Sequence, residues 1–172
     1  MFNRPALEEF PEYTRNYIDL VPEGNIIDIL KTQQEMAYSL LSGITEEQAQ
    51  YRYGKGKWSL SEVLGHLSDT ERIMSYRILR IARGDRSPLE GFDENRFVEE
   101  AIFHLRPMAD LLEEHQNVRK ATISLLKGLP VASLKNKGNA NGYHVTVETV
   151  AYMIAGHEQH HLKIIKERYL GS

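Results

Sequence analysis

The stretch GHEQHHLKIIKERYL (156–170) carries three of the chain's seven histidines within five residues. His157 and His161 are four residues apart, a spacing that places two side chains on one face of a helix, with their Cβ atoms about 6 Å apart. In the helix predicted over 147–169, both continue an apolar stripe whose steps alternate between three and four, as in the interior of a helical bundle. Two imidazoles so placed indicate a site for one divalent metal ion, because a shared cation removes the cost of burying unpaired polar groups.

The alternative is that each of these histidines is a core residue satisfied by a hydrogen bond of its own. His160 is expected to point off the stripe, toward a flank of the helix. An open catalytic metal site needs a third ligand. His66 is one candidate, at the edge of the inward stripe of its own predicted helix, and His115 is a rival with a better stripe position. Periodicity leaves that choice open, and His104 and His144 are expected near loops at the surface.

Three carboxylates are close in sequence to these histidines. Glu62 lies one turn before His66, Asp69 lies three residues after it, and Glu158 adjoins His157. A metal-bound histidine usually donates its second ring N–H to a carboxylate or a carbonyl. We therefore consider these acids as supports for ligand histidines or as a general base, the alternative being solvated acids on the outside of the helices.

Four long amphipathic patterns must position these residues. Helices are predicted over 25–42, 60–83, 107–127 and 147–169, from apolar residues at helical spacing and from their end signals. Ser59 with Glu62 and Thr45 with Gln48 have the spacing of capping boxes, and Asp93 is expected to cap a short helix that ends near residue 102. The pattern predicts an all-α fold, an antiparallel four-helix bundle.

The length of 172 residues favours a single domain spanning 1–172. Residues 1–22 contain three prolines and are expected to be an irregular lead-in whose aromatics Phe10, Tyr13 and Tyr17 pack onto the body. The segment KNKGNANGYHV is expected to be a loop with a short extended piece. GFDENRF and GNANGY are loops at the predicted mouth of the site, where Asn95 and Asn141 are candidates for substrate contact or for loop capping.

The chain has no cysteine, so disulfides, cysteine-ligated zinc and a thiol nucleophile of its own are excluded. The N-terminal sequence lacks the pattern of a signal peptide, and we expect a cytoplasmic protein without membrane spans. The net charge of −3 gives no reason to expect nucleic acid binding. A group of arginines could grip phosphate, but acids interleave with it: Arg72, Arg77, Arg80, Arg83 and Arg86 alternate with Asp69, Glu71, Asp85 and Glu90.

Two motifs together resemble the DinB/YfiT-like superfamily: KWSLSEVLGHLSDTERIMSYRILRIARGD and, far downstream, AYMIAGHEQHHLKIIKERYL. The resemblance extends from Pro5 to Leu170. It implies a four-helix bundle that binds one divalent metal through His66, His157 and His161, and so favours His66 over His115. Zinc and nickel are the metals usually associated with this superfamily, and homodimers are common in it.

The function that the resemblance implies is a metal-dependent hydrolase or a thiol S-transferase that acts on a small molecule. Thiol chemistry would use an external low-molecular-weight thiol, since the chain has no cysteine. Both reactions are available to a site with three neutral imidazoles, because the metal lowers the pKa of a bound water or thiol. The alternative is a non-catalytic metal- or ligand-binding stress-response protein with a filled coordination shell.

Overall fold

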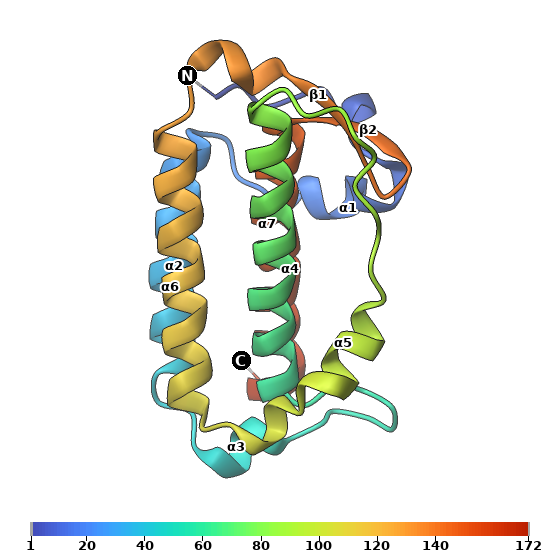
Figure 1. Ribbon diagram of the computed structural model, residues 1–172. Coiled ribbons are helices and arrows are strands. Elements are labelled where there is room, and N and C mark those ends of the chain that lie inside the picture. The colour runs from blue at the N-terminus through green and yellow to red at the C-terminus, as the bar shows by residue number, and fades with distance from the viewer. Residues whose placement is uncertain (1, 172) are drawn as a thin grey trace.

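The structure is a computed structural model that describes residues 2–171. Its helices and strands are α1 (Arg15–Ile18), α2 (Ile26–Leu41), α3 (Glu46–Gln50), α4 (Leu60–Ala82), α5 (Glu94–Ala101), α6 (Met108–Lys127), β1 (Lys137–Ala140), β2 (Tyr143–Thr146) and α7 (Val147–Ile164). The four long helices α2, α4, α6 and α7 form the predicted four-helix bundle, with the β1–β2 hairpin at one end and α3 and α5 at the other (Figure 1). None of the helices in residues 2–171 is both long enough and apolar enough to cross a membrane.

The long helices begin where their caps are. The side chain of Ser59 accepts a hydrogen bond from the backbone N–H of Glu62, and that of Thr146 accepts one from the N–H of Thr149, so both helices open with a capping box. Asp93 caps α5 as expected. These local bonds satisfy backbone donors that a helix leaves free in its first turn, which is why the starts of α4 and α7 were readable from the sequence.

The direction of the helices differs in part from a simple antiparallel bundle. α2 runs antiparallel to α6, and α4 runs antiparallel to α7, but α4 and α6 run in the same direction (Figure 1). The segment between Arg83 and Pro107 returns the chain along the length of the bundle, so both helices start at the same end. Phe103, just before α6, accordingly packs its ring against Gly65, near the start of α4.

The core of the bundle has two apolar parts with a polar layer between them. One apolar cluster lies toward the hairpin and includes Ile78 and Ile154, and the other lies toward α3 and includes Leu64 and Leu162. The middle of the helices instead buries polar and charged side chains: His66, Ser68, Thr70, Glu71, His115, Arg119 and Glu158. Buried polar groups are costly unless they are paired, so this layer is the part of the bundle that needs a specific explanation.

The first 22 residues are more regular than expected. They contain two short 3₁₀ turns (Leu7–Glu9 and Glu12–Thr14) followed by α1. Phe10 packs in the core as predicted. Tyr13 is about half exposed, but its ring packs against that of Tyr143 in the hairpin, with centroids 5.3 Å apart. α1 forms because it can lie directly on α7 at Gly156, whose missing side chain leaves room for the backbone of Tyr17.

Gly156 provides a direct test of that contact. A Cβ atom at this position would lie 2.8 Å from the carbonyl oxygen of Tyr17, so Gly156→Ala must push α1 away from α7. We expect the free energy of unfolding, measured by urea denaturation, to fall by about 1–3 kcal/mol. Gly43→Ala is the matched control, because nothing lies within 4 Å of a Cβ built there. Equal midpoints for both variants would contradict the close packing of α1.

Two segments near the end of the chain also differ in detail from expectation. KNKGNANGYHV forms a complete hairpin, β1 paired antiparallel with β2, rather than a loop with a short extended piece. The last helix extends to the predicted end at Tyr169, but its final turn, Ile165–Leu170, is π-helical rather than α-helical. That turn brings the hydroxyl of Tyr169 to the carbonyl of Trp58, at 2.7 Å. The end of α7 is thus attached to the residues that precede α4.

Candidate metal centre

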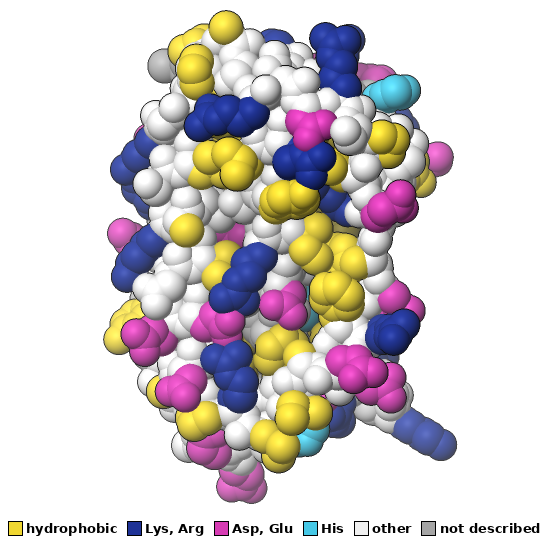
Figure 2. All heavy atoms as spheres, in the orientation of Figure 1, with side chains coloured by type: hydrophobic (Ala, Val, Ile, Leu, Met, Phe, Trp, Pro, Cys, Tyr) yellow, Lys and Arg dark blue, Asp and Glu magenta, His cyan; other side chains and the backbone are white. Residues whose placement is uncertain are grey.

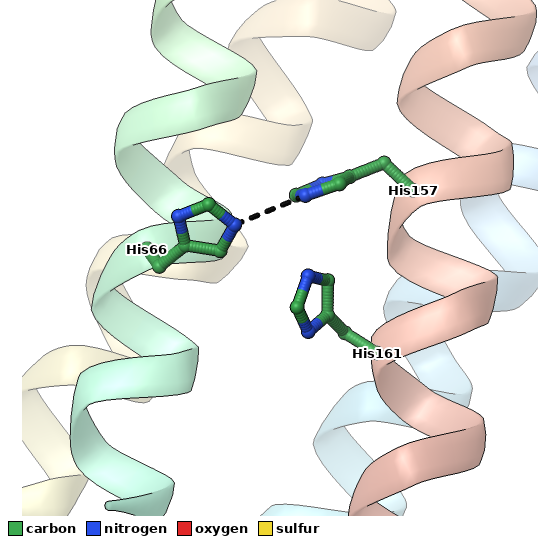
Figure 3. A group of neighbouring side chains, drawn as sticks. All are labelled: His66, His157 and His161. Atoms are coloured by element: carbon green, nitrogen blue, oxygen red, sulfur yellow. Dashed lines mark hydrogen bonds between the residues drawn. The ribbon is translucent and has the colours of Figure 1, made fainter. Parts of the chain in front are cut away.

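Three histidines converge between α4 and α7. His66 projects from α4, and His157 and His161 project from successive turns of α7 toward it (Figure 3). One ring nitrogen of each lies within 4.8 Å of one ring nitrogen of each of the others. The Nε2 atoms of His66 and His157 are 3.0 Å apart. The structure therefore brings together the three histidines that the sequence comparison with the superfamily singled out.

These distances fit a bound cation. Nitrogen ligands of zinc lie about 2.0–2.1 Å from the ion, which places two of them about 3.3 Å apart in a tetrahedral site. The separation of the His66 and His157 nitrogens, 3.0 Å, is close to that value. Within residues 2–171, no carboxylate oxygen lies within 4.0 Å of a ring nitrogen of His66, His157 or His161. An ion held by these three rings would keep its full charge.

Burial sets the charge state of the rings. It lowers the pKa of His66 to about 4. Burial also lowers the pKa of His161 to about 3, with a further contribution from the neighbouring His66. The pKa of His157 lies well below its ordinary value for the same reasons, burial first and then the other histidines. All three rings are therefore neutral at pH 7, which is the form that ligates a metal.

The other nitrogen of His66 faces a hydroxyl. Thr70, one turn further along α4, places its Oγ1 atom 3.4 Å from Nδ1 of His66. The indole of Trp58 packs against the same ring, with centroids 4.7 Å apart. These two neighbours hold the imidazole with its Nε2 atom directed toward α7.

The three carboxylates considered from the sequence have other partners. Glu62 is bonded to Arg52 and to the backbone N–H of Ser59, where it completes the capping box. Asp69 pairs with Arg72 on the same helix. The partners of Glu62 and Asp69 therefore lie on α4 or beside it, and neither carboxylate contacts a ring nitrogen of the three histidines.

Glu158 is neither solvated nor bonded to a histidine of the cluster. It is buried, and its carboxylate pairs with the guanidinium of Arg119. Burial alone would raise the pKa of Glu158, but Arg119 and then His115 outweigh it and lower the pKa to about 2. Glu158 belongs to a charge network on the side of α7 that faces α6.

The remaining histidines are separate from the cluster, with one exception. His115 is fully buried and lies 3.4 Å from an oxygen of Glu158, on the side of the charge network. His104 and His144 are exposed, as expected. His160 points toward a flank, where its ring packs against Tyr17 and, more edge-on, against His161. It thereby lines the same cavity as the cluster.

A cavity of about 280 Å³ opens onto the three histidines. Its wall includes residues that the sequence did not single out for this site: Tyr17, Trp58, Thr70, Arg77 and Glu94. Glu94 is the one carboxylate residue in that wall among residues 2–171. A signal for two of them was present, because His66, Thr70, Met74 and Arg77 follow one another at steps of four, four and three along α4. Of the two asparagines considered from the sequence, Asn141 lines the cavity. Asn95 does not, because it lies in the first turn of α5 rather than in the expected loop.

A bundle of four helices with three histidines brought together from two of them is compatible with more than one activity and does not identify one. The comparison with protein families identifies the class of protein. A family model described as the DinB superfamily matches residues 29–165. This chain belongs to the DinB superfamily.

Individual relatives are distant. A protein of Oceanobacillus iheyensis, provisionally named a metal-dependent hydrolase, is 25% identical over 129 residues, which are 73% of each chain. YfiT from Bacillus subtilis, a four-helix bundle provisionally described as a metal-dependent hydrolase, superposes with a TM-score of 0.76 at 20% identity, over 85% of this chain and 86% of its own. The mycothiol-dependent maleylpyruvate isomerase superposes with a TM-score of 0.67 at 13% identity, over 92% of this chain and 62% of its own.

Proposed function

We propose that His66, His157 and His161 bind one divalent metal ion, zinc or nickel, and that the protein is a metal-dependent hydrolase acting on a small molecule. The observation that carries this proposal is the convergence of three neutral imidazoles, from helices far apart in the sequence, at the wall of a cavity. The provisional names of the relatives support it. A bound ion would supply Lewis-acid activation of a water molecule at this site.

The chain's own residues would then bind, orient and exchange protons. His66 is oriented by Thr70 and Trp58, so its ring does not have to reorganise when a ligand arrives. Glu94, at the start of α5, is the carboxylate of the cavity wall, and we assign it the role of proton acceptor. The aromatic rings of Tyr17 and Trp58 shield the histidines from bulk water, which strengthens electrostatic interactions inside the cavity.

Glu94→Gln tests that role. We expect kcat to fall by about 10²-fold or more, because a positioned general base contributes about 10²–10⁴-fold. The metal content should stay at that of the wild type, since Glu94 is not one of the converging ligands. Glu99→Gln, on the same helix and outside the cavity wall, is the matched control and should leave kcat unchanged. An unchanged kcat for Glu94→Gln would remove it from the mechanism.

Thiol transfer is the second candidate. The fold is shared with a mycothiol-dependent enzyme, and the chain has no cysteine that could replace an external thiol. The same cavity would then bind a low-molecular-weight thiol, and the metal would favour its thiolate form. The two candidates differ in the nucleophile and use the same histidines.

One set of assays separates these possibilities. Metal-loaded protein is tested on ester and amide substrates and, separately, on an electrophile together with a small thiol. We expect hydrolysis that stops on chelation and returns with zinc or nickel. Turnover that requires the thiol would favour transfer. A fully loaded protein that turns over neither group of substrates would support a non-catalytic metal- or ligand-binding protein.

A further inference from the structure

Two arginines of the described chain are buried, and only one of them has acidic partners. Arg119 is fully buried, and its guanidinium is paired with Glu71 and Glu158. Arg77 is 7% exposed, and no carboxylate within residues 2–171 lies within 4.0 Å of its nitrogens. A buried charge without a counter-charge is strongly unfavourable unless something else neutralises it. Arg77 therefore requires an explanation that Arg119 does not.

Arg77 faces the cavity. One of its N–H groups donates to the backbone carbonyl of Glu90, at 2.7 Å, which fixes the side chain against the segment after α4. Its side chain forms part of the same cavity wall as the three histidines. The two other arginines of α4 have acidic partners. Arg72 pairs with Asp69 and Glu114, and Arg80 pairs with Asp85. Burial lowers the pKa of Arg77, as expected for a cation that lacks a nearby anion.

The position of Arg77 relative to the histidines bears on the shape of a ligand. Arg77 and His66 are eleven residues apart on one stripe of α4, which separates their backbones by about 16 Å. Thr70 and Met74 lie between them on the cavity wall. A molecule with one end at the histidines and the other at Arg77 must therefore be elongated.

The cavity wall near Arg77 is held in place by contacts between the β1–β2 hairpin and the segment after α4. The backbone of Leu89 bonds to Asn139 and Asn141 of the β1–β2 hairpin, at 3.0 and 2.8 Å. Gly91 packs so closely that a Cβ atom there would lie 2.1 Å from the side-chain oxygen of Asn141. The hairpin and the segment after α4 thus hold each other in place beside Arg77.

We propose that Arg77 is the anion-binding subsite of this cavity, and that the substrate is an elongated small molecule with a carboxylate at the end remote from the histidines. This inference rests on the proposed function, in which the histidine cavity binds the substrate. A guanidinium offers a planar pair of donors that matches a carboxylate. Within residues 2–171 the cavity wall has one arginine, no lysine and one acid, Glu94, so a single negative charge suits it better than a phosphate dianion.

The chain contains a reporter for the test. Trp58 is its one tryptophan and lies in the cavity wall against His66. Quenching of its fluorescence measures the binding of octanoate and of octanamide, which have similar shapes and differ in charge. The titrations use the wild type, Arg77→Met, Arg77→Lys and His157→Ala.

We expect octanoate to bind the wild type at least about tenfold more tightly than octanamide, because hydrogen bonds to charged groups are the stronger ones. His157→Ala should keep that preference and Arg77→Met should lose it. Arg77→Lys should keep a reduced preference, and it decides the matter if Arg77→Met does not fold.

Three results would overturn the inference. The first is equal binding of both probes by the wild type. The second is an unchanged preference for octanoate in Arg77→Met or, if that variant does not fold, in Arg77→Lys, and the third is loss of the preference in His157→Ala, which would place the carboxylate at the metal. The proposed function is tested by a separate result. A wild type without metal would refute the metal site, while the preference for octanoate in His157→Ala still decides the subsite.

Discussion

His157→Ala is expected to leave the purified protein almost free of metal, whereas the wild type should carry close to one equivalent of zinc or nickel. The Nε2 atom of His157 lies 3.0 Å from that of His66, so its loss removes one of three convergent ligands. Loss of an outer partner of a metal ligand already weakens binding about 10–100-fold, and loss of the ligand itself should cost more. Elemental analysis of untagged protein measures the result.

Two controls make that measurement specific. His115→Ala removes a buried histidine that lies beside Glu158 and outside the converging group, and it should keep its metal. His104→Ala removes an exposed histidine and controls for metal bound at the surface. Circular dichroism establishes that each variant is folded. A wild type that binds no metal even after incubation with excess zinc or nickel would mean that the histidines are core polar groups.

Arg119→Met is expected to destabilise the fold more than any other single change of a charged residue in the bundle. Arg119 lies on α6 and contacts all three other long helices. It donates to Glu71 on α4, at 2.7–3.0 Å, to the carbonyl of Leu30 on α2, at 3.1 Å, and to Glu158 on α7. Removing it leaves two buried carboxylates without a counter-charge, which costs about 3–5 kcal/mol.

Urea unfolding measures that loss, with Arg72→Met as the matched control. Arg72 also makes two ion pairs, with Asp69 and Glu114, but its side chain is 48% exposed. Exposed pairs contribute about 0–1 kcal/mol, so this variant should unfold near the wild-type midpoint. Adding Glu71→Gln to Arg119→Met should recover part of the lost stability. A loss below about 1 kcal/mol for Arg119→Met would show that the network is not what joins the helices.

The sequence predicted the helices well because the signals that start them are local. Caps such as Ser59 and Thr146 lie within three residues of the groups that they satisfy, and the apolar stripes repeat within each helix. The choice between His66 and His115 as the third ligand could not be made from local signals. Periodicity tells which face of a helix is buried, but not which helix lies opposite, and His66 faces α7 only because α4 and α7 are neighbours.

The partners of Glu158 were beyond prediction for the same reason. An acid next to a core histidine was expected in solvent or beside the metal, but Glu158 lies on the side of α7 that faces α6, and it is buried there. A carboxylate buried at this position needs a cation as its partner, and Arg119 on α6 supplies it. Glu94 was missed because the cavity wall is assembled from loops and helices that only the tertiary fold brings together. Arg77 was missed although its spacing places it on the same stripe of α4 as His66.

His66 and His157 are 91 residues apart in the chain, and Arg119 precedes Glu158 by 39. While the ribosome is still making residues before α7, the nascent chain holds one of the three histidines and an arginine that lacks one of its two carboxylates. Neither the histidine cluster nor the charge network can form until α7 has left the exit tunnel and docked. A metal bound as proposed would therefore be loaded late in biogenesis, by chains whose four helices have already assembled.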